Sequence, residues 1–91
     1  MRTIIFLNRF KKDVKRTKKR GKDLTKLEEV IGLLAEDIDL PVRCRPHKLV
    51  GNYEGFWECH IEPDWLLVYA LNDEENTLDL ARTGSHSDLF R

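Results

Sequence analysis

The chain has 91 residues, of which 41% are hydrophobic and 35% are charged, and its formal net charge at neutral pH is zero. This length suffices for one compact domain and excludes two, so we expect a single domain over residues 1–91 whose functional site is a surface groove. No apolar run approaches the roughly 20 residues that cross a bilayer, and no secretory leader opens the sequence, so we expect a cytoplasmic protein with no membrane partner.

The first predicted elements are a strand and two helices. Residues 2–7 are rich in apolar and β-branched residues at both odd and even positions, which predicts a short strand buried on both faces of a sheet. Asn8 is a candidate cap for a helix that Gly21 ends. Asp23 is a candidate cap for a second helix, in which Leu24, Leu27, Val30, Ile31 and Leu34 form one apolar stripe facing the sheet. The short link between the helices predicts an antiparallel pair.

The positive charge is concentrated in the N-terminal part of the chain, which includes the first of these helices. Residues 1–26 hold eleven Lys or Arg against two Asp (+9), whereas residues 27–91 hold five against fourteen acidic residues (−9). A helix with this charge attracts phosphates and releases their counterions. The alternative is a basic face that only contacts solvent.

Strands follow the helices. Residues 42–49, interrupted by Pro46, predict an edge or irregular strand, and residues 50–55 predict a loop with two glycines. Residues 65–71 and 77–83 predict two further strands, joined by a polar turn. The order predicts an α+β fold: an N-terminal strand, an antiparallel helix pair, and about four antiparallel strands, with the helices on one face.

The strand predicted over residues 56–62 alternates clearly. Trp57, Cys59 and Ile61 should face one side, and Phe56, Glu58, His60 and Glu62 should face the other. Two cysteines, Cys44 and Cys59, are too few for a disulfide framework, and we expect both to be reduced. Together with three histidines they offer too few closely spaced ligands to predict a metal site.

Three histidines are the candidate catalytic residues. His60 lies four residues before Asp64, which can orient an imidazole, and His86 follows the glycine that ends the last strand. His47 lies in the loop-flanking segment after Pro46. Taken singly, each is also consistent with an ordinary surface or loop histidine.

Taken together, these residues suit cleavage of RNA by its own 2′-hydroxyl. That reaction needs a base for the hydroxyl, an acid for the leaving 5′-oxygen, and cations for the phosphorane, and histidines serve both proton roles near neutral pH. Arg82 and Lys48 are candidate phosphate ligands. Phe90 is a candidate for stacking on a base, or a plug that fixes the chain terminus.

These motifs resemble one family. Residues 10–15, 47–51, 60–69 and 82–86, with the sequences FKKDVK, HKLVG, HIEPDWLLVY and RTGSH, are together similar to the YafQ branch of the RelE-like toxins of type II toxin–antitoxin modules. The resemblance covers essentially the whole chain. It implies helices packed on a twisted antiparallel sheet and a ribosome-dependent endoribonuclease that cuts messenger RNA in the A site and leaves a 2′,3′-cyclic phosphate.

The resemblance also implies site residues and partners. His47, His60, Asp64 and His86 match the catalytic positions, with His86 as general acid, His47 or His60 as general base, and Asp64 as their orienting partner. It implies no cofactor and no metal, and it implies a cognate antitoxin, the 70S ribosome and messenger RNA as partners. Docking to ribosomal RNA then falls to the basic helix, through Lys11, Lys12, Lys15, Arg16, Lys18 and Lys19.

Two alternatives remain at this point. ParE-like toxins share the architecture and bind DNA gyrase without cutting RNA, and fold alone does not separate the two classes. A plain RNA-binding domain would grip phosphates with its basic helix and cut nothing. The histidine set distinguishes the nuclease, because neither alternative requires it.

Overall fold

The computed structural model describes residues 1–90, so Arg91, the last residue of the predicted domain, lies outside the described part. The elements in chain order are β1 (Thr3–Phe6), α1 (Asn8–Lys19), α2 (Leu24–Ala35), the 3₁₀ turn η1 (Val42–Cys44), β2 (His47–Lys48), the 3₁₀ turn η2 (Gly51–Tyr53), β3 (Trp57–Glu62), β4 (Trp65–Asn72), β5 (Thr77–Gly84) and α3 (His86–Leu89). The predicted α+β class and the order of strand, two helices and four strands are confirmed.

One five-stranded sheet organises the chain, in the order β1-β5-β4-β3-β2. Strands β2 to β5 pair antiparallel, as predicted, whereas β1 pairs parallel with β5, so the sheet is mixed. β4 lies at the centre and its first five residues are buried, which explains why this segment is apolar on both parities.

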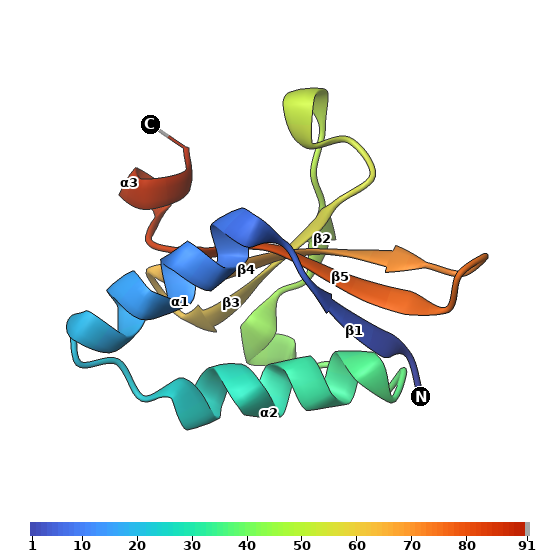
Figure 1. Ribbon diagram of the computed structural model, residues 1–91, viewed down its shortest axis with the longest axis horizontal. Coiled ribbons are helices and arrows are strands. Elements are labelled where there is room, and N and C mark those ends of the chain that lie inside the picture. The colour runs from blue at the N-terminus through green and yellow to red at the C-terminus, as the bar shows by residue number, and fades with distance from the viewer. Residues whose placement is uncertain (91) are drawn as a thin grey trace.

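The larger part of the core lies between the sheet and the first two helices (Figure 1). The predicted stripe of α2 is confirmed, since Leu27, Val30 and Leu34 are buried against the sheet. Asp23 accepts a hydrogen bond from the Thr25 backbone N–H and caps α2, also as predicted. No helix within residues 1–90 has the length and apolar character needed to cross a bilayer.

A second, smaller cluster covers the opposite face of the sheet. It contains Leu66, Val68, Ala81 and Leu89, with the loop around η2 packed beside it. In Figure 1, α3 and that loop stand on the side of the sheet away from α2. The two predicted helices pack on one face, as expected, and the four-residue α3, which the sequence did not predict, covers the other.

Two predictions about the N-terminal segment are also wrong. β1 is an edge strand with one neighbour, so Ile5 and Phe6 are 39% and 50% exposed rather than buried on both faces. Asn8 is the first residue of α1 and not its cap. Leu7 occupies the cap position and makes no side-chain hydrogen bond there.

A β-bulge changes the alternation of β3. Glu58 and His60 pair with Val68 and Leu66, so they face the smaller cluster together, as predicted. The register then shifts between His60 and Glu62. Glu62 consequently points to the helical side, where its carboxylate accepts from the Nζ atoms of Lys22 at 2.9 Å and Lys26 at 2.8 Å. The prediction that Glu62 shares the face of His60 is wrong for this reason.

The cysteines behave as expected for structural thiols. Cys44 and Cys59 are free, and both are almost fully buried, at 1% and 0% exposed. Burial raises the pKa of Cys59 to about 12, so this thiol stays protonated at neutral pH.

Candidate functional site

The three histidines converge on the sheet face that α3 covers. The ring centroids of His60 and His86 are 5.8 Å apart. His47 Nε2 lies 3.4 Å from Glu58 Oε1, and a Glu58 oxygen lies within 4.8 Å of ring nitrogens of both His60 and His86. Residues from β2, β3 and α3 are therefore gathered in one place, as the sequence predicted; their catalytic roles stay predictions.

His86 is held by Asp64 through two hydrogen bonds. Asp64 Oδ1 accepts from the backbone N–H of His86 at 3.0 Å and lies 2.6 Å from its Nδ1. The backbone hydrogen bond and then the ring contact lower the pKa of Asp64, so its carboxylate is charged at neutral pH. A charged carboxylate only accepts, so Nδ1 of His86 carries a hydrogen and Nε2 is left for a ligand.

His60 is fixed by the turn that follows β3. Its Nδ1 lies 3.2 Å from the carbonyl oxygen of Pro63. A carbonyl only accepts, so this nitrogen carries the hydrogen and, in the neutral ring, Nε2 presents its lone pair. Within residues 1–90, Nε2 of His60 and Nε2 of His86 make no hydrogen bond, and both rings lie on the same face.

His47 is engaged at both nitrogens. Its Nδ1 lies 3.1 Å from the carbonyl oxygen of Arg45, and its Nε2 faces the Glu58 carboxylate. Both partners are acceptors, so the ring that satisfies them carries a hydrogen on each nitrogen. His47 thus has a protein acceptor near each nitrogen, whereas His60 and His86 have one at Nδ1 only.

Glu58 is the residue of this site that sequence reasoning missed as a functional candidate. It is 6% exposed and lies among all three imidazoles. The alternation of β3 already placed it on the same face as His60, which was the available signal. A glutamate that alternates with apolar residues in a strand ordinarily faces solvent. Only the pairing of β2 with β3 brings His47 next to Glu58.

Arg82, a predicted phosphate ligand, is engaged inside the protein. Its Nε and Nη2 donate to the carboxylate of Asp13 at 2.7 and 3.3 Å, and Asp13 also accepts from the Thr83 N–H at 3.1 Å. The hydrogen bond with Asp13 raises the pKa of Arg82. Arg82 is 7% exposed and Asp13 3%. Binding of RNA by Arg82 stays a prediction, and this ion pair already occupies two of its nitrogens.

The same ion-pair network reaches α3. Arg16 Nη2 donates to Asp13 at 2.9 Å and lies 3.8 Å from Asp88. Asp88 accepts from Arg20 at 2.6 Å and from the backbone N–H of Ser85 at 2.9 Å, completing a capping box at the start of α3. Arg16, predicted to dock on ribosomal RNA, therefore points at carboxylates of its own chain.

Gly84 is required where β5 turns into α3. A Cβ atom at this position would lie 2.9 Å from Asp88 Oδ2 and 3.1 Å from Arg16 Nη2. Any side chain would displace this network, and with it the helix whose first residue is His86.

The two remaining predicted ligands lie on different faces of the sheet: Lys48 pairs with Trp57, which packs against the larger core, whereas Phe90 lies beside the smaller cluster. Lys48, on the edge strand β2, places Nζ 5.6 Å from the ring centroid of Trp57. Phe90 is 39% exposed and meets Tyr53 edge-on at 5.6 Å between ring centroids. Its ring is thus supported on one side by Tyr53; its stacking on a base stays a prediction.

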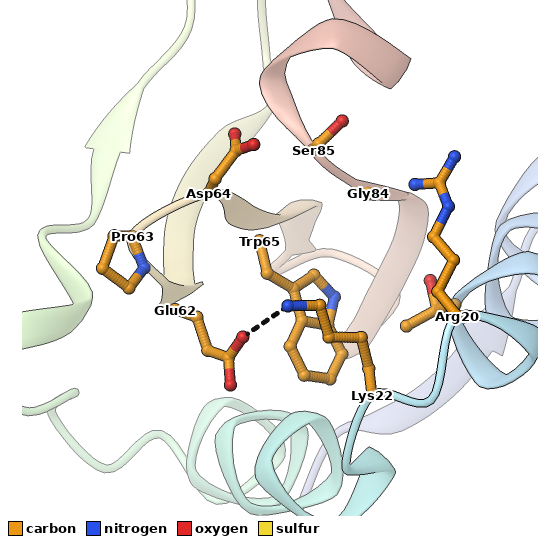
Figure 2. A pocket seen from close by; sticks show the side chains of 9 residues that line it. Arg20, Lys22, Glu62, Pro63, Asp64, Trp65, Gly84 and Ser85 are labelled. Atoms are coloured by element: carbon orange, nitrogen blue, oxygen red, sulfur yellow. Dashed lines mark hydrogen bonds and ion pairs between the residues drawn. The ribbon is translucent and has the colours of Figure 1, made fainter.

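A hollow of about 430 Å³ adjoins Asp64 on the α1 side (Figure 2). Arg20 and Lys22 line it together with Glu62, Asp64 and Ser85. Figure 2 shows the Lys22 ammonium directed at the Glu62 carboxylate, and Arg20 pairs with Asp88. The cations of this hollow are therefore already paired with carboxylates.

Glu58, His60 and His86 also form a possible metal-binding group. Their ligand atoms all lie within 4.8 Å of one another. Two imidazoles and a carboxylate are a donor set that suits zinc or copper. The two imidazoles are those with Nε2 open to a ligand, so a metal ion and an RNA phosphate would compete for them.

Comparisons with known proteins agree with one another. A family model described as "Bacterial toxin of type II toxin-antitoxin system, YafQ" matches residues 2–91. The mRNA interferase toxin YafQ of Escherichia coli strain K12 is 40% identical over 90 residues, covering 98% of this chain and 96% of that protein. A metal-bound toxin from Helicobacter pylori has a TM-score of 0.94 at 47% identity, covering 99% of this chain and 100% of that one. YafQ in the E. coli DinJ–YafQ complex has a TM-score of 0.91 at 39% identity, covering 100% of both chains.

Proposed function

This chain belongs to the YafQ family of bacterial toxins from type II toxin–antitoxin systems, and from that premise we propose that it is an mRNA interferase acting on the ribosome. It is an endoribonuclease that enters the A site of the 70S ribosome in the cytoplasm and cuts messenger RNA there. The observation that supports this most directly is the pair His60 and His86, 5.8 Å apart, each with Nε2 free for the substrate.

The proposed reaction uses these two nitrogens. Nε2 of His60 removes the proton of a ribose 2′-hydroxyl, and O2′ attacks the adjacent phosphorus. The bond from phosphorus to O5′ breaks, and Nε2–H of His86 protonates the leaving oxygen. The products are a 2′,3′-cyclic phosphate and a 5′-hydroxyl end, and the proton gained by His60 balances the one lost by His86.

The choice of His60 as base follows from the partners of each ring. His60 donates from Nδ1 to a carbonyl and so keeps a lone pair on Nε2, whereas His47 is engaged at both nitrogens. His86 holds Asp64 at Nδ1, and this contact directs Nε2 toward the leaving oxygen. The buried Glu58 then holds the exposed ring of His47, and this pair orients the substrate beside the reacting phosphate.

The proposed partners extend beyond the ribosome. The E. coli YafQ toxin forms a complex with DinJ, and we infer that this chain has a cognate antitoxin of its own. A gyrase-binding toxin or a plain RNA-binding domain would have no use for the contacts of Asp64 with His86 or of Glu58 with His47. The proposed chemistry requires no metal ion or organic cofactor.

The test is direct cleavage. The purified chain is incubated with a defined messenger RNA, with and without 70S ribosomes, and 5′ ends are mapped by primer extension. We expect cuts within codons only when ribosomes are present, and their loss with His86→Gln. Cleavage of free RNA at the same rate, or no cleavage in either reaction, would contradict the proposal.

A further inference from the structure

A second hollow opens beside His60, on the other side of the turn after β3. It measures about 420 Å³ and is lined by Arg43, Arg45, His60, Ile61, Glu62 and Pro63. We call it the Arg43–Arg45 hollow. His60 is the proposed base, so whatever occupies this hollow lies next to the reacting phosphate.

The arginines of this hollow differ from the other cations around the site. Within residues 1–90, the guanidinium groups of Arg43 and Arg45 make no hydrogen bond and no ion pair, and both residues are exposed. Arg82, Arg20 and Lys22 are each bound to a carboxylate of the protein itself. Arg43 and Arg45 are therefore the guanidinium groups beside the histidines that are free to bind an anion.

The backbone holds both arginines in place. Arg43 lies in η1. The next residue, Cys44, is only 1% exposed, and its burial anchors this turn. Arg45 follows in the left-handed region, at φ 48°, which is uncommon for a residue other than glycine or asparagine. Its carbonyl oxygen meets Nδ1 of His47, so this unusual conformation connects the arginine pair to the histidine cluster.

The electrostatics of the site call for such cations. Glu58 and Asp64 place two carboxylates beside the histidines, and every RNA phosphate adds another negative charge. Glu62, the carboxylate that borders the hollow, is already neutralised by Lys22 and Lys26. The hollow therefore presents the two arginines with no competing free carboxylate, and a guanidinium fork matches phosphate oxygens in geometry.

We propose that Arg43 and Arg45 bind an RNA backbone phosphate adjacent to the one being cleaved, which makes the Arg43–Arg45 hollow a phosphate subsite. The inference rests on the function proposed above. It assigns to these two residues the phosphate binding that sequence reasoning gave to Arg82.

The test is a thermodynamic cycle on programmed ribosomes. Messenger RNAs carry one neutral methylphosphonate linkage, placed in turn at each position flanking the cleaved phosphate, and the toxin concentration that gives half-maximal cleavage is measured. The variant is Arg43→Gln with Arg45→Asn, since asparagine tolerates the left-handed backbone. For wild type, we expect the neutral linkage at one flanking position to raise the half-maximal concentration by about tenfold or more, a typical value for a charge-assisted contact. For the double variant, the same linkage should change the half-maximal concentration little.

Two control variants sharpen the result. Arg43→Lys with Arg45→Lys keeps the charge and should retain part of the linkage effect. Arg9→Gln removes one exposed arginine from α1 and should leave the linkage effect at its wild-type size. Equal linkage effects in wild type and the double variant would overturn the inference, because the arginines would then act on something other than that phosphate.

The same experiment separates this inference from the proposed function. If wild type cuts programmed messenger RNA and the double variant shows the wild-type linkage effect, the phosphate subsite is wrong and the nuclease stands. If wild type cuts nothing on ribosomes, the proposed function fails, and the subsite fails with it.

Discussion

The position of one hydrogen on each imidazole decides what the histidines can do. His60 faces a carbonyl through Nδ1, His86 faces a carboxylate through Nδ1, and both leave Nε2 open. In the proposed mechanism the base is the ring whose Nδ1 meets a neutral carbonyl, and the acid is the ring whose Nδ1 meets a carboxylate.

This assignment predicts the pH dependence of cleavage. A base must be deprotonated and an acid protonated, so cleavage on saturating ribosomes should rise and then fall with pH. His60→Gln should abolish the rising limb and His86→Gln the falling limb, each lowering the maximum by about 10²–10⁴-fold. Single-turnover rates from pH 5.5 to 9 measure both limbs. A falling limb that persists in His86→Gln would assign the acid to another residue.

The same two rings predict the response to metal ions. Chelation with EDTA, with free Mg²⁺ restored to keep ribosomes intact, should leave cleavage unchanged. Added Zn²⁺ or Cu²⁺ should inhibit by occupying Glu58, His60 and His86. Isothermal titration of the ribosome-free toxin reports binding directly, and His60→Ala should weaken it. A toxin that loses activity with EDTA and regains it with zinc would contradict the metal-free mechanism.

At the scale of elements, one buried carboxylate joins α1 to β5. Asp13 is reached by Arg82, Arg16 and the Thr83 backbone N–H, and it is 3% exposed. It satisfies the free edge of β5 beyond the end of β1, where no strand pairs. An acidic residue in a strongly basic helix thus has a structural reason that the sequence alone did not reveal.

Removing this carboxylate should be costly. Asp13→Ala leaves a buried Arg82 unpaired, and breaking a buried ion pair typically destabilises a protein by about 3–5 kcal/mol. Urea unfolding at pH 7 measures the loss. Lys12→Ala, on the exposed face of the same helix, should change stability by no more than about 0.5 kcal/mol. A small loss of unfolding free energy in Asp13→Ala would show that solvent reaches Arg82.

The capping of α3 predicts a pH dependence of stability. The Arg20 hydrogen bond holds the pKa of Asp88 well below its ordinary value, against the opposing effect of burial. The stabilisation by Asp88 is therefore complete above the unfolded pKa of about 3.9 and is lost as pH falls through the lower folded value. Asp88→Ala should cost about 1 kcal/mol at pH 7, a typical value for a lost helix cap.

The measurement for Asp88 is urea unfolding at pH 7, 4 and 2.5. The difference between wild type and Asp88→Ala should shrink toward the lowest pH. Glu74→Ala, in the exposed turn between β4 and β5, serves as the control and should show no such difference. A constant difference across this range would mean that the Asp88 charge does not matter.

Periodicity in the sequence predicted the longer elements but neither the short helix α3 nor the contacts between distant segments. The α2 stripe and the central strand followed from periodicity, because burial on one or both faces leaves a direct mark on residue type. α3 was missed although Ser85 and Asp88 have the spacing of a capping box, since four residues carry no periodic signal. Glu58 and Asp13 were missed for a related reason: their partners come from distant segments, and only the strand register and the α1 packing bring them together.

At the scale of the whole molecule, the positive charge of the N-terminal third is divided between two uses. Arg16 and Arg20 point at Asp13 and Asp88 and hold the fold together. Five lysines of α1 are exposed and make no ion pair within residues 1–90: Lys11, Lys12, Lys15, Lys18 and Lys19. The docking surface predicted for ribosomal RNA therefore consists of these lysines without Arg16.

Charge reversal tests this surface. The triple variant changes Lys11, Lys15 and Lys18 to Glu. It should bind the ribosome more weakly and with a smaller dependence on salt, because each lost phosphate contact lowers the slope of log affinity against log salt concentration by about 0.7–0.9. Filter binding at several salt concentrations gives the slope. The cleavage rate on saturating ribosomes should stay at the wild-type value, which serves as the internal control. Unchanged affinity would assign docking to another surface.

The β-bulge in β3 decides which face of the sheet receives the charge of Glu62. His60 and Glu62 are two positions apart yet serve opposite sides of the sheet, because the register shifts between them. A strand of the same sequence without this shift would place Glu62 on the face of His60, bring an acidic group to the imidazoles, and leave two ammonium groups of the helical layer unmatched. One extra residue in a strand thus keeps a repelling charge out of the path of the nucleic acid.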